Sequence, residues 1–209
     1  MKVVIPESLD DITLGKFQEM SKLLNDESLT GYELDNAILK IIIGFDNIEK
    51  IALKDRNELL IDVRKALEKE GNFQNTFTLN DIEFGMIPNF DNITGGEYTD
   101  LIKYADEIDD FHRFIAVCYR PIISKDRFNN YLIESYEGTS KYAELMKQLP
   151  MSVANGVKVF FWSLTKDLEK HTAMFTEVER VRALKRQTTF KNGGFMQRFI
   201  VWLKGIYSR

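Results

Sequence analysis

The stretch IPESLDDITLGKF at residues 5–17 returns at residues 87–98 as IPNFDNITGGEY, one residue shorter. Six positions are identical in the two copies, and the pairs Leu9/Phe90 and Phe17/Tyr98 keep their apolar character. A repeat of this kind is typical of one supersecondary unit that is built twice and packed against itself. The shared residues form no acid–base, nucleophilic or metal-binding set. The repeat therefore predicts architecture rather than catalysis.

Both copies carry the signals of a helix start. Thr13 and Thr94 are suitable N-caps, because a threonine hydroxyl can accept a hydrogen bond from a free amide of the first helical turn. Glu97 completes a capping box in the second copy, whereas a lysine stands at this position of the first copy. The residues that flank each first turn fit a hydrophobic staple, in the pairs Ile12/Phe17 and Ile93/Tyr98.

Apolar periodicity predicts the remaining elements. Residues 77–86 alternate around Asn80-Asp81 and predict a β-hairpin with a two-residue turn. Pro121 is expected to stop the helix before it, residues 122–140 look loop-like, and residues 131–136 are compatible with a short strand. The predicted helices span residues 14–25, 31–44, 55–69, 95–104, 108–119, 141–148, 153–176 and 195–207.

These elements predict a mainly α protein. It would contain a duplicated helix-pair module, a small β-hairpin between the copies and a C-terminal amphipathic helical arm. The expected units are a first helical repeat at 1–72, the hairpin at 73–86, a second repeat with a long helix at 87–187, and a basic amphipathic arm at 188–209.

Composition narrows the class of protein. The chain has 209 residues, of which 44% are hydrophobic, so it is long enough for one large domain or two small ones. No run approaches the roughly 18–20 apolar residues of a membrane-spanning helix, and the first residues do not resemble a signal peptide. A single cysteine, Cys118, excludes an internal disulfide and suits a reducing compartment. We expect synthesis and folding in a cytoplasm.

The net charge of −4 hides a strong asymmetry. Residues 180–209 contain eight lysines and arginines and no acid, so residues 1–179 hold 20 basic residues against all 32 acidic ones. The C-terminal segment thus carries +8 and the body −12. A basic tail on an acidic body is typical of a surface that meets a polyanion or an acidic partner.

The search for catalytic and cofactor-binding residues is negative. The glycine pairs at 95–96 and 193–194 lack the context of a phosphate-binding loop. The two histidines, His112 and His171, form no cluster with metal-ligand spacing and are expected to be ordinary helical residues. Cys118 lies in an apolar helix and is expected to be a small core residue. We predict no enzymatic activity, no metal and no cofactor.

An acidic cluster occupies residues 106–110. Asp106, Glu107, Asp109 and Asp110 surround a predicted helix start, where negative charge complements the helix dipole. Calcium binding would need convergent oxygens and a turn-forming glycine at loop spacing. Capping and solvation are the expected roles, with a cation or a basic partner as the alternative.

The basic C-terminal segment is the candidate partner-binding site. It could contact nucleic acid, lie in a membrane interface, dock into a groove of another subunit, or fold back onto its own acidic body. Docking on another protein is the favoured reading, DNA proximity is an alternative, and membrane binding is not favoured. The predicted contact residues are Arg182, Lys185, Arg186, Lys191, Phe195, Arg198, Phe199, Trp202, Lys204 and Ile206.

Three stretches resemble a family of tailed-bacteriophage proteins encoded among the virion genes of crAss-like and some large marine phages. They are the first repeat copy, the second copy with its preceding FGM at residues 84–86, and FHRFIAVCYRPI at residues 111–122. The likeness runs from about residue 5 to 175. It departs at Gly95, where the family more often has a large residue. The resemblance carries over no catalytic residue and implies a structural or assembly component.

Sequence and resemblance together predict a virion structural protein, such as a ring or connector subunit of the head–tail or tail region. Its partners would be portal, tail or neighbouring ring subunits, and the chain would form a homo-oligomer. One alternative is an assembly chaperone for a tail or capsid protein that leaves the finished particle. Another is a packaged cargo protein that is ejected with the genome. A metal-dependent hydrolase built on the acidic cluster lacks the histidines it would need.

Overall fold

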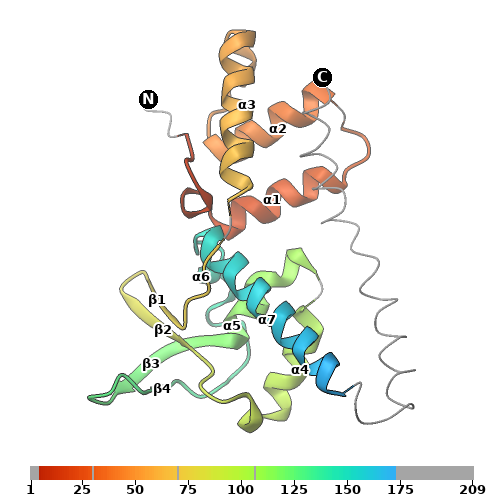
Figure 1. Cartoon of the computed structure of the whole chain (residues 1–209). Coiled ribbons are helices and arrows are strands. Elements are labelled where there is room, and N and C mark those ends of the chain that lie inside the picture. The colour runs from red at the N-terminus through yellow and green to blue at the C-terminus, as the bar shows by residue number, and fades with distance from the viewer. Residues whose placement is uncertain (1–4, 30, 70, 106, 173–209) are drawn as a thin grey trace.

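The computed structural model describes residues 5–29, 31–69, 71–105 and 107–172 (Figure 1). Three helices form an N-terminal lobe: α1 (Leu14–Asn25), α2 (Gly31–Ile43) and α3 (Leu53–Leu67). α2 packs against both α1 and α3. The apolar faces of these helices bury Phe17, Ile38 and Val63 in the core. The predicted bounds of α1 are confirmed, and those of α2 and α3 lie within two residues of the prediction.

A four-stranded antiparallel sheet forms the base of the second lobe. The strands are β1 (Thr76–Leu79), β2 (Ile82–Met86), β3 (Tyr119–Lys125) and β4 (Tyr131–Ile133), in the order β1-β2-β3-β4. Asn80 and Asp81 have φ angles of 48° and 61°, as the two central residues of a type I′ turn require. The predicted hairpin and its turn are therefore confirmed.

The prediction of a mainly α fold with only a hairpin is wrong, because two further strands make the fold mixed α/β. Helix α5 (Phe111–Cys118) ends three residues before Pro121, and Tyr119 begins β3. β3 pairs with β2 through Tyr119↔Met86 and Pro121↔Phe84. This pairing joins segments about 35 residues apart, so nothing in the local apolar pattern distinguishes the strand from the end of the helix.

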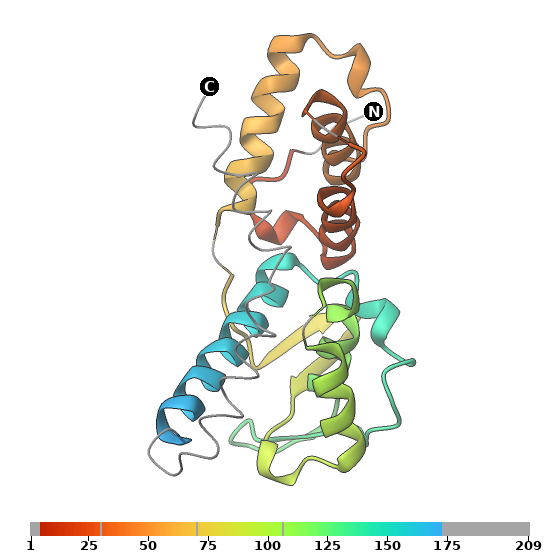
Figure 2. The same ribbon diagram turned by 90° about the vertical axis from the view of Figure 1, so that its right-hand side faces the viewer.

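Helices pack around the sheet (Figure 2). α4 (Gly95–Tyr104) precedes α5, and a short α6 (Ala143–Met146) leads to α7 (Met151–Thr172), the longest described helix. Aromatic rings hold α7 in place: Phe160 stacks on Phe73 at 4.2 Å between centroids, and Phe161 meets Phe90 and Phe114 edge to face. The predicted helix near 141–148 is confirmed as the shorter α6, and the long helix begins at Met151, two residues before its predicted start; its predicted end at 176 lies outside the described residues.

The two repeat copies adopt the same local structure. A 3₁₀ turn (Leu9–Asp11 or Phe90–Asn92) is followed by a threonine cap and a helix, α1 or α4. Thr13 Oγ1 accepts from the Lys16 amide, whereas Thr94 and Glu97 form the full capping box. Both predictions are confirmed. The copies differ four residues after the cap, because Phe17 is buried and Tyr98 leaves 55% of its surface exposed.

The first copy is hydrogen-bonded to the turn before α7. The Leu14 amide donates to Leu149 O and the Gly15 amide to Lys147 O, both at 2.8 Å, while the Met151 amide donates to Ile12 O at 2.7 Å. Side chains from both lobes belong to one continuous core. The start of α1 is therefore fixed by backbone bonds to a segment more than 130 residues away.

Candidate interaction surface

The predicted partner-binding residues lie in the C-terminal segment, outside the described residues. These are Arg182, Lys185, Arg186, Lys191, Phe195, Arg198, Phe199, Trp202, Lys204 and Ile206. Among the described residues, the candidates for a functional site are three buried polar clusters and two exposed apolar patches.

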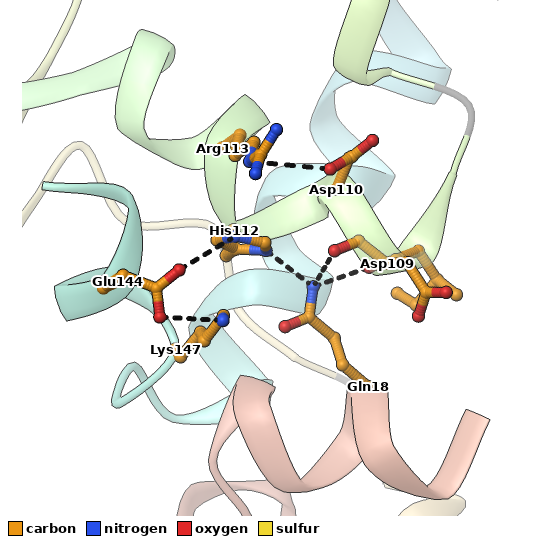
Figure 3. Close-up of polar contacts among 8 residues, drawn as sticks. Gln18, Asp109, Asp110, His112, Arg113, Glu144 and Lys147 are labelled. Carbon is orange, nitrogen blue, oxygen red and sulfur yellow. Dashed lines mark hydrogen bonds and ion pairs between the residues drawn. The ribbon is translucent and has the colours of Figure 1, made fainter. Parts of the chain in front are cut away.

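The first buried cluster joins the two lobes (Figure 3). Gln18 Nε2 on α1 donates to Ile108 O at 2.7 Å and to Asp109 O at 3.1 Å, and it lies 3.0 Å from His112 Nδ1. Two carbonyl oxygens can only accept, so the Gln18 group facing them is the amide NH₂. His112 Nδ1 is therefore an acceptor and the ring proton sits on Nε2, 3.8 Å from Glu144 Oε1.

This environment keeps His112 neutral. Burial, followed by the positive charge of Lys147, lowers the pKa of His112, against the smaller opposing effects of Glu144 and Asp110. The imidazole on α5 is almost fully enclosed and contacts Gln18 on α1. His112 thus holds the lobes together, in line with the expected helical histidine. The side chain of His171 on α7 lies outside the described part.

The second cluster is an ion pair between α4 and β3. Arg120 Nη2 lies 2.6 Å from Glu97 Oε1, and the side chains are 10% and 5% exposed. Burial raises the pKa of Glu97, but the hydrogen bonds from Thr94 and the charge of Arg120 outweigh it, and the pKa is lowered. Glu97 therefore stays ionised at neutral pH. Its capping role was visible in the sequence; its partner on β3 was not.

The third cluster lies between α2 and α3. Asp35 accepts from Arg64 Nη2 at 3.0 Å and lies 3.8 Å from Arg56 Nη2, and both arginines are buried. Arg56 also donates to Asn36 Oδ1 at 2.6 Å and stacks over the Tyr32 ring at 4.2 Å. This cluster was not predicted from the sequence, because an arginine on an amphipathic helix is normally expected on the solvent-exposed face.

No catalytic or metal-binding arrangement emerges within the described ranges. They contain no group of three or more His, Cys, Asp or Glu residues that could hold a metal ion. Cys118 is fully buried, and burial raises the pKa of its thiol, as expected of a core cysteine. None of the described helices is long and apolar enough to cross a membrane.

The acidic cluster is only partly explained by capping. Asp110 stands at the N-cap of α5 without a side-chain cap bond, and instead pairs with Arg113 at 3.6 Å. Glu107 precedes the 3₁₀ turn at Ile108–Asp110 and makes no side-chain cap bond either, so a capping hydrogen bond is absent at both residues. Glu107 and Asp109 are exposed, and Asp106 lies outside the described residues. Exposed negative charge thus remains just beyond the end of α4.

Two patches of large apolar side chains are exposed on ordered elements. The hairpin patch consists of Ile123, Phe128 and Leu132, which are 65%, 70% and 64% exposed on the β3–β4 hairpin. The α4 patch consists of Tyr98 and Ile102, one helical turn apart and both more than half exposed. Neither patch was predicted from the sequence, because most of the hairpin looked like loop and Tyr98 was expected to pack on Ile93 in a hydrophobic staple.

Comparisons with known proteins do not supply a function. The chain matches no protein-family model, no curated protein and no solved structure.

Proposed function

We propose that this chain is a structural subunit of a tailed-bacteriophage virion, in a ring or connector of the head–tail or tail region. It acts by binding other copies of itself and neighbouring virion proteins such as portal or tail subunits. The observation that carries this proposal is the presence of large apolar side chains exposed on well-ordered elements. Groups of large apolar side chains that stay exposed on a folded body are typical of protein–protein contact sites.

The buried polar clusters support a rigid scaffold. Gln18, Glu97 and Asp35 each take part in a buried cluster that ties one helix to another element of the body. Buried hydrogen bonds and ion pairs between elements restrict how those elements move relative to one another. A rigid body with exposed contact surface suits a subunit that must repeat the same contact many times around an axis.

The C-terminal segment supplies a second means of contact. Its charge of +8 and the apolar spacing of Phe195, Phe199 and Trp202 suit an amphipathic arm that reaches an acidic partner. The resemblance to phage virion proteins favours a virion as the assembly to which this chain belongs. An assembly chaperone would use the same surfaces, but it would be absent from the finished particle.

Particle composition tests the proposal. Particles of the phage that encodes this chain are purified on a density gradient and probed with a quantitative antibody against residues 5–172. A fixed copy number per particle, unchanged after salt washing and genome release, is the expected result. Absence from particles would contradict the structural role and favour the chaperone. Loss together with the genome would favour a cargo protein.

A further inference from the structure

The tip of the β3–β4 hairpin is built to hold one conformation. The Asp126 carboxylate accepts from the Phe128 amide at 2.7 Å and from the Asn130 amide at 2.9 Å, and the Asn130 side chain adds a bond at 2.8 Å. Asn129 takes a left-handed φ of 64°, and the Asp126 amide closes the loop on Asn130 O at 2.9 Å. The tip is preorganised, which lowers the entropic cost of binding.

This rigid tip presents an aromatic ring and a cation to solvent. Phe128 is the most exposed large apolar residue of the described chain, and the Arg127 guanidinium lies 4.6 Å from the centre of its ring. Lys125 is paired with Glu83, and Asp126 is bound within the loop. Arg127 is therefore the cation that the hairpin offers to a partner, next to Phe128.

The α4 patch has the complementary character. Tyr98 and Ile102 lie on one side of α4, and the chain runs within three residues of its end into exposed Glu107 and, after it, Asp109. Asp110 is already paired with Arg113. The exposed apolar side chains of α4 are thus followed along the chain by two exposed carboxylates, with exposed Lys103 lying over the Tyr104 ring between them. On the hairpin, the exposed Phe128 ring lies next to a guanidinium.

The two patches lie on different sides of the molecule. Figure 1 shows the β3–β4 hairpin extending away from the helices, with α4 on the other side of the sheet. A tip-to-tip dimer would bring two Arg127 side chains together, which costs free energy. Contact between unlike patches is heterologous and repeats from copy to copy, and it closes into a ring when the rotation allows.

We propose that the hairpin patch of one copy, with Arg127, docks on the α4 patch of the next copy, beside Glu107 and Asp109. This inference rests on the proposed function, since it names the contact by which the subunits assemble. Two or three large side chains from each copy cover less than the roughly 1,000 Å² of a stable interface. The contact therefore sets the register of the assembly, and further surface such as the C-terminal arm adds affinity.

Cross-linking tests the pairing of the patches. Ser124 and Thr99 are exposed next to Ile123 and Tyr98 and belong to neither patch. They are replaced by cysteine singly and together in the full-length chain, which is treated with a short bismaleimide and run on denaturing gels. The buried Cys118 serves as an internal background. The double variant should give a ladder of covalent oligomers, whereas each single variant should remain monomeric. A dimer from Ser124→Cys alone, or no ladder from the double variant, would overturn the inference.

Charge reversal provides an independent readout. Arg127→Glu or Asp109→Lys alone should raise the protein concentration at which oligomers form by roughly three- to tenfold. The double variant should form oligomers at a concentration close to that of the wild-type protein. Phe128→Ser should raise this concentration roughly thirtyfold, as for a central aromatic anchor. Leu53→Ser is the matched control, because Leu53 is 63% exposed on α3 and belongs to neither patch.

The outcomes separate this inference from the proposed function. Wild-type oligomers that persist unchanged in Phe128→Ser and Arg127→Glu would overturn the hairpin contact and leave the structural role intact. A wild-type chain that is monomeric and absent from particles would overturn both. Thermal melts of each variant establish that the body remains folded.

Discussion

Arg120 Nη2 lies 2.6 Å from Glu97 Oε1 in the interior of the second lobe. The carboxylate also accepts from the Thr94 amide at 2.6 Å, so one side chain caps α4 and binds β3. The second repeat copy is thereby coupled to the strand that converts the predicted hairpin into a four-stranded sheet. This link between a local helix cap and a distant strand explains how the repeat fits into a mixed fold.

We predict that Glu97→Gln destabilises the protein by about 3 kcal/mol, the typical cost of breaking a buried ion pair. Glutamine can keep the capping box, but it leaves the buried charge of Arg120 without its counterion. Urea unfolding measures the loss. The matched control is Glu58→Gln, which removes an exposed partner of Lys54 and should cost under about 0.5 kcal/mol. Equal losses in the two variants would contradict the buried pair.

Stability should fall as the pH drops from about 6.5 to 5, because of His112. The unfolded histidine takes up a proton near pH 6.5, whereas burial lowers the pKa of His112 in the folded state. The unfolded state then binds more protons in this window, so acidification favours unfolding.

The variant His112→Asn isolates this effect. Asparagine keeps an acceptor near Nδ1 for Gln18 and does not titrate, so the dependence of the urea midpoint on pH should flatten between pH 7.5 and 5.5. His171 and the carboxylates are common to both proteins and cancel in the comparison. An unchanged slope would show that His112 takes up a proton in the folded state as readily as in the unfolded one.

Gly156→Ala should destabilise the protein by about 1–3 kcal/mol, as expected for overpacking. A Cβ at Gly156 would lie 2.4 Å from the Asn72 carbonyl and 2.5 Å from the Phe73 amide nitrogen, where the backbone crosses α7. Alanine normally stabilises a helix interior relative to glycine, so the sign of the effect is diagnostic. Gly95→Ala is the control, because a Cβ there meets nothing within 4 Å. It should be neutral or stabilising.

Deletion of residues 188–209 should leave the body folded and abolish assembly. The described core is formed by residues up to Val157, with Phe160 and Phe161 packed against it, so the deletion removes none of these contacts. Circular dichroism and size-exclusion chromatography with light scattering report folding and mass. An unchanged oligomer after the deletion would contradict the role of the arm.

The helix caps and the hairpin turn were predicted correctly from the sequence, because they depend only on neighbouring residues. Thr13 and Thr94 cap helices, and Asn80-Asp81 turns a hairpin, because each of these structures is decided within about four residues. The start of β3 at Tyr119 was missed because its partner Met86 is distant in the sequence. The run FIAVCY at residues 114–119, which precedes Pro121, fits a buried helix and a buried strand equally well.

The candidate surface was harder to predict than the fold. Phe128 looked like a loop residue, and Leu132 lay in a stretch compatible with a short strand, which β4 confirms for residues 131–133. Only the pairing of β3 with β4 shows that both residues stand on one hairpin. Gln18 is a polar residue on the buried face of α1, among Leu14, Phe17 and Ser21. A polar residue on a buried helix face indicates a buried hydrogen bond. The sequence could not identify the partners of Gln18, because they belong to the other lobe.

Native mass spectrometry of the purified full-length chain, recorded over a range of protein concentrations, tests the central claim most directly. The account predicts a single closed oligomer of fixed copy number that grows at the expense of monomer as concentration rises. It also predicts that Phe128→Ser shifts this equilibrium toward monomer while Leu53→Ser does not. A chain that stays monomeric at every concentration would contradict assembly through its own surfaces.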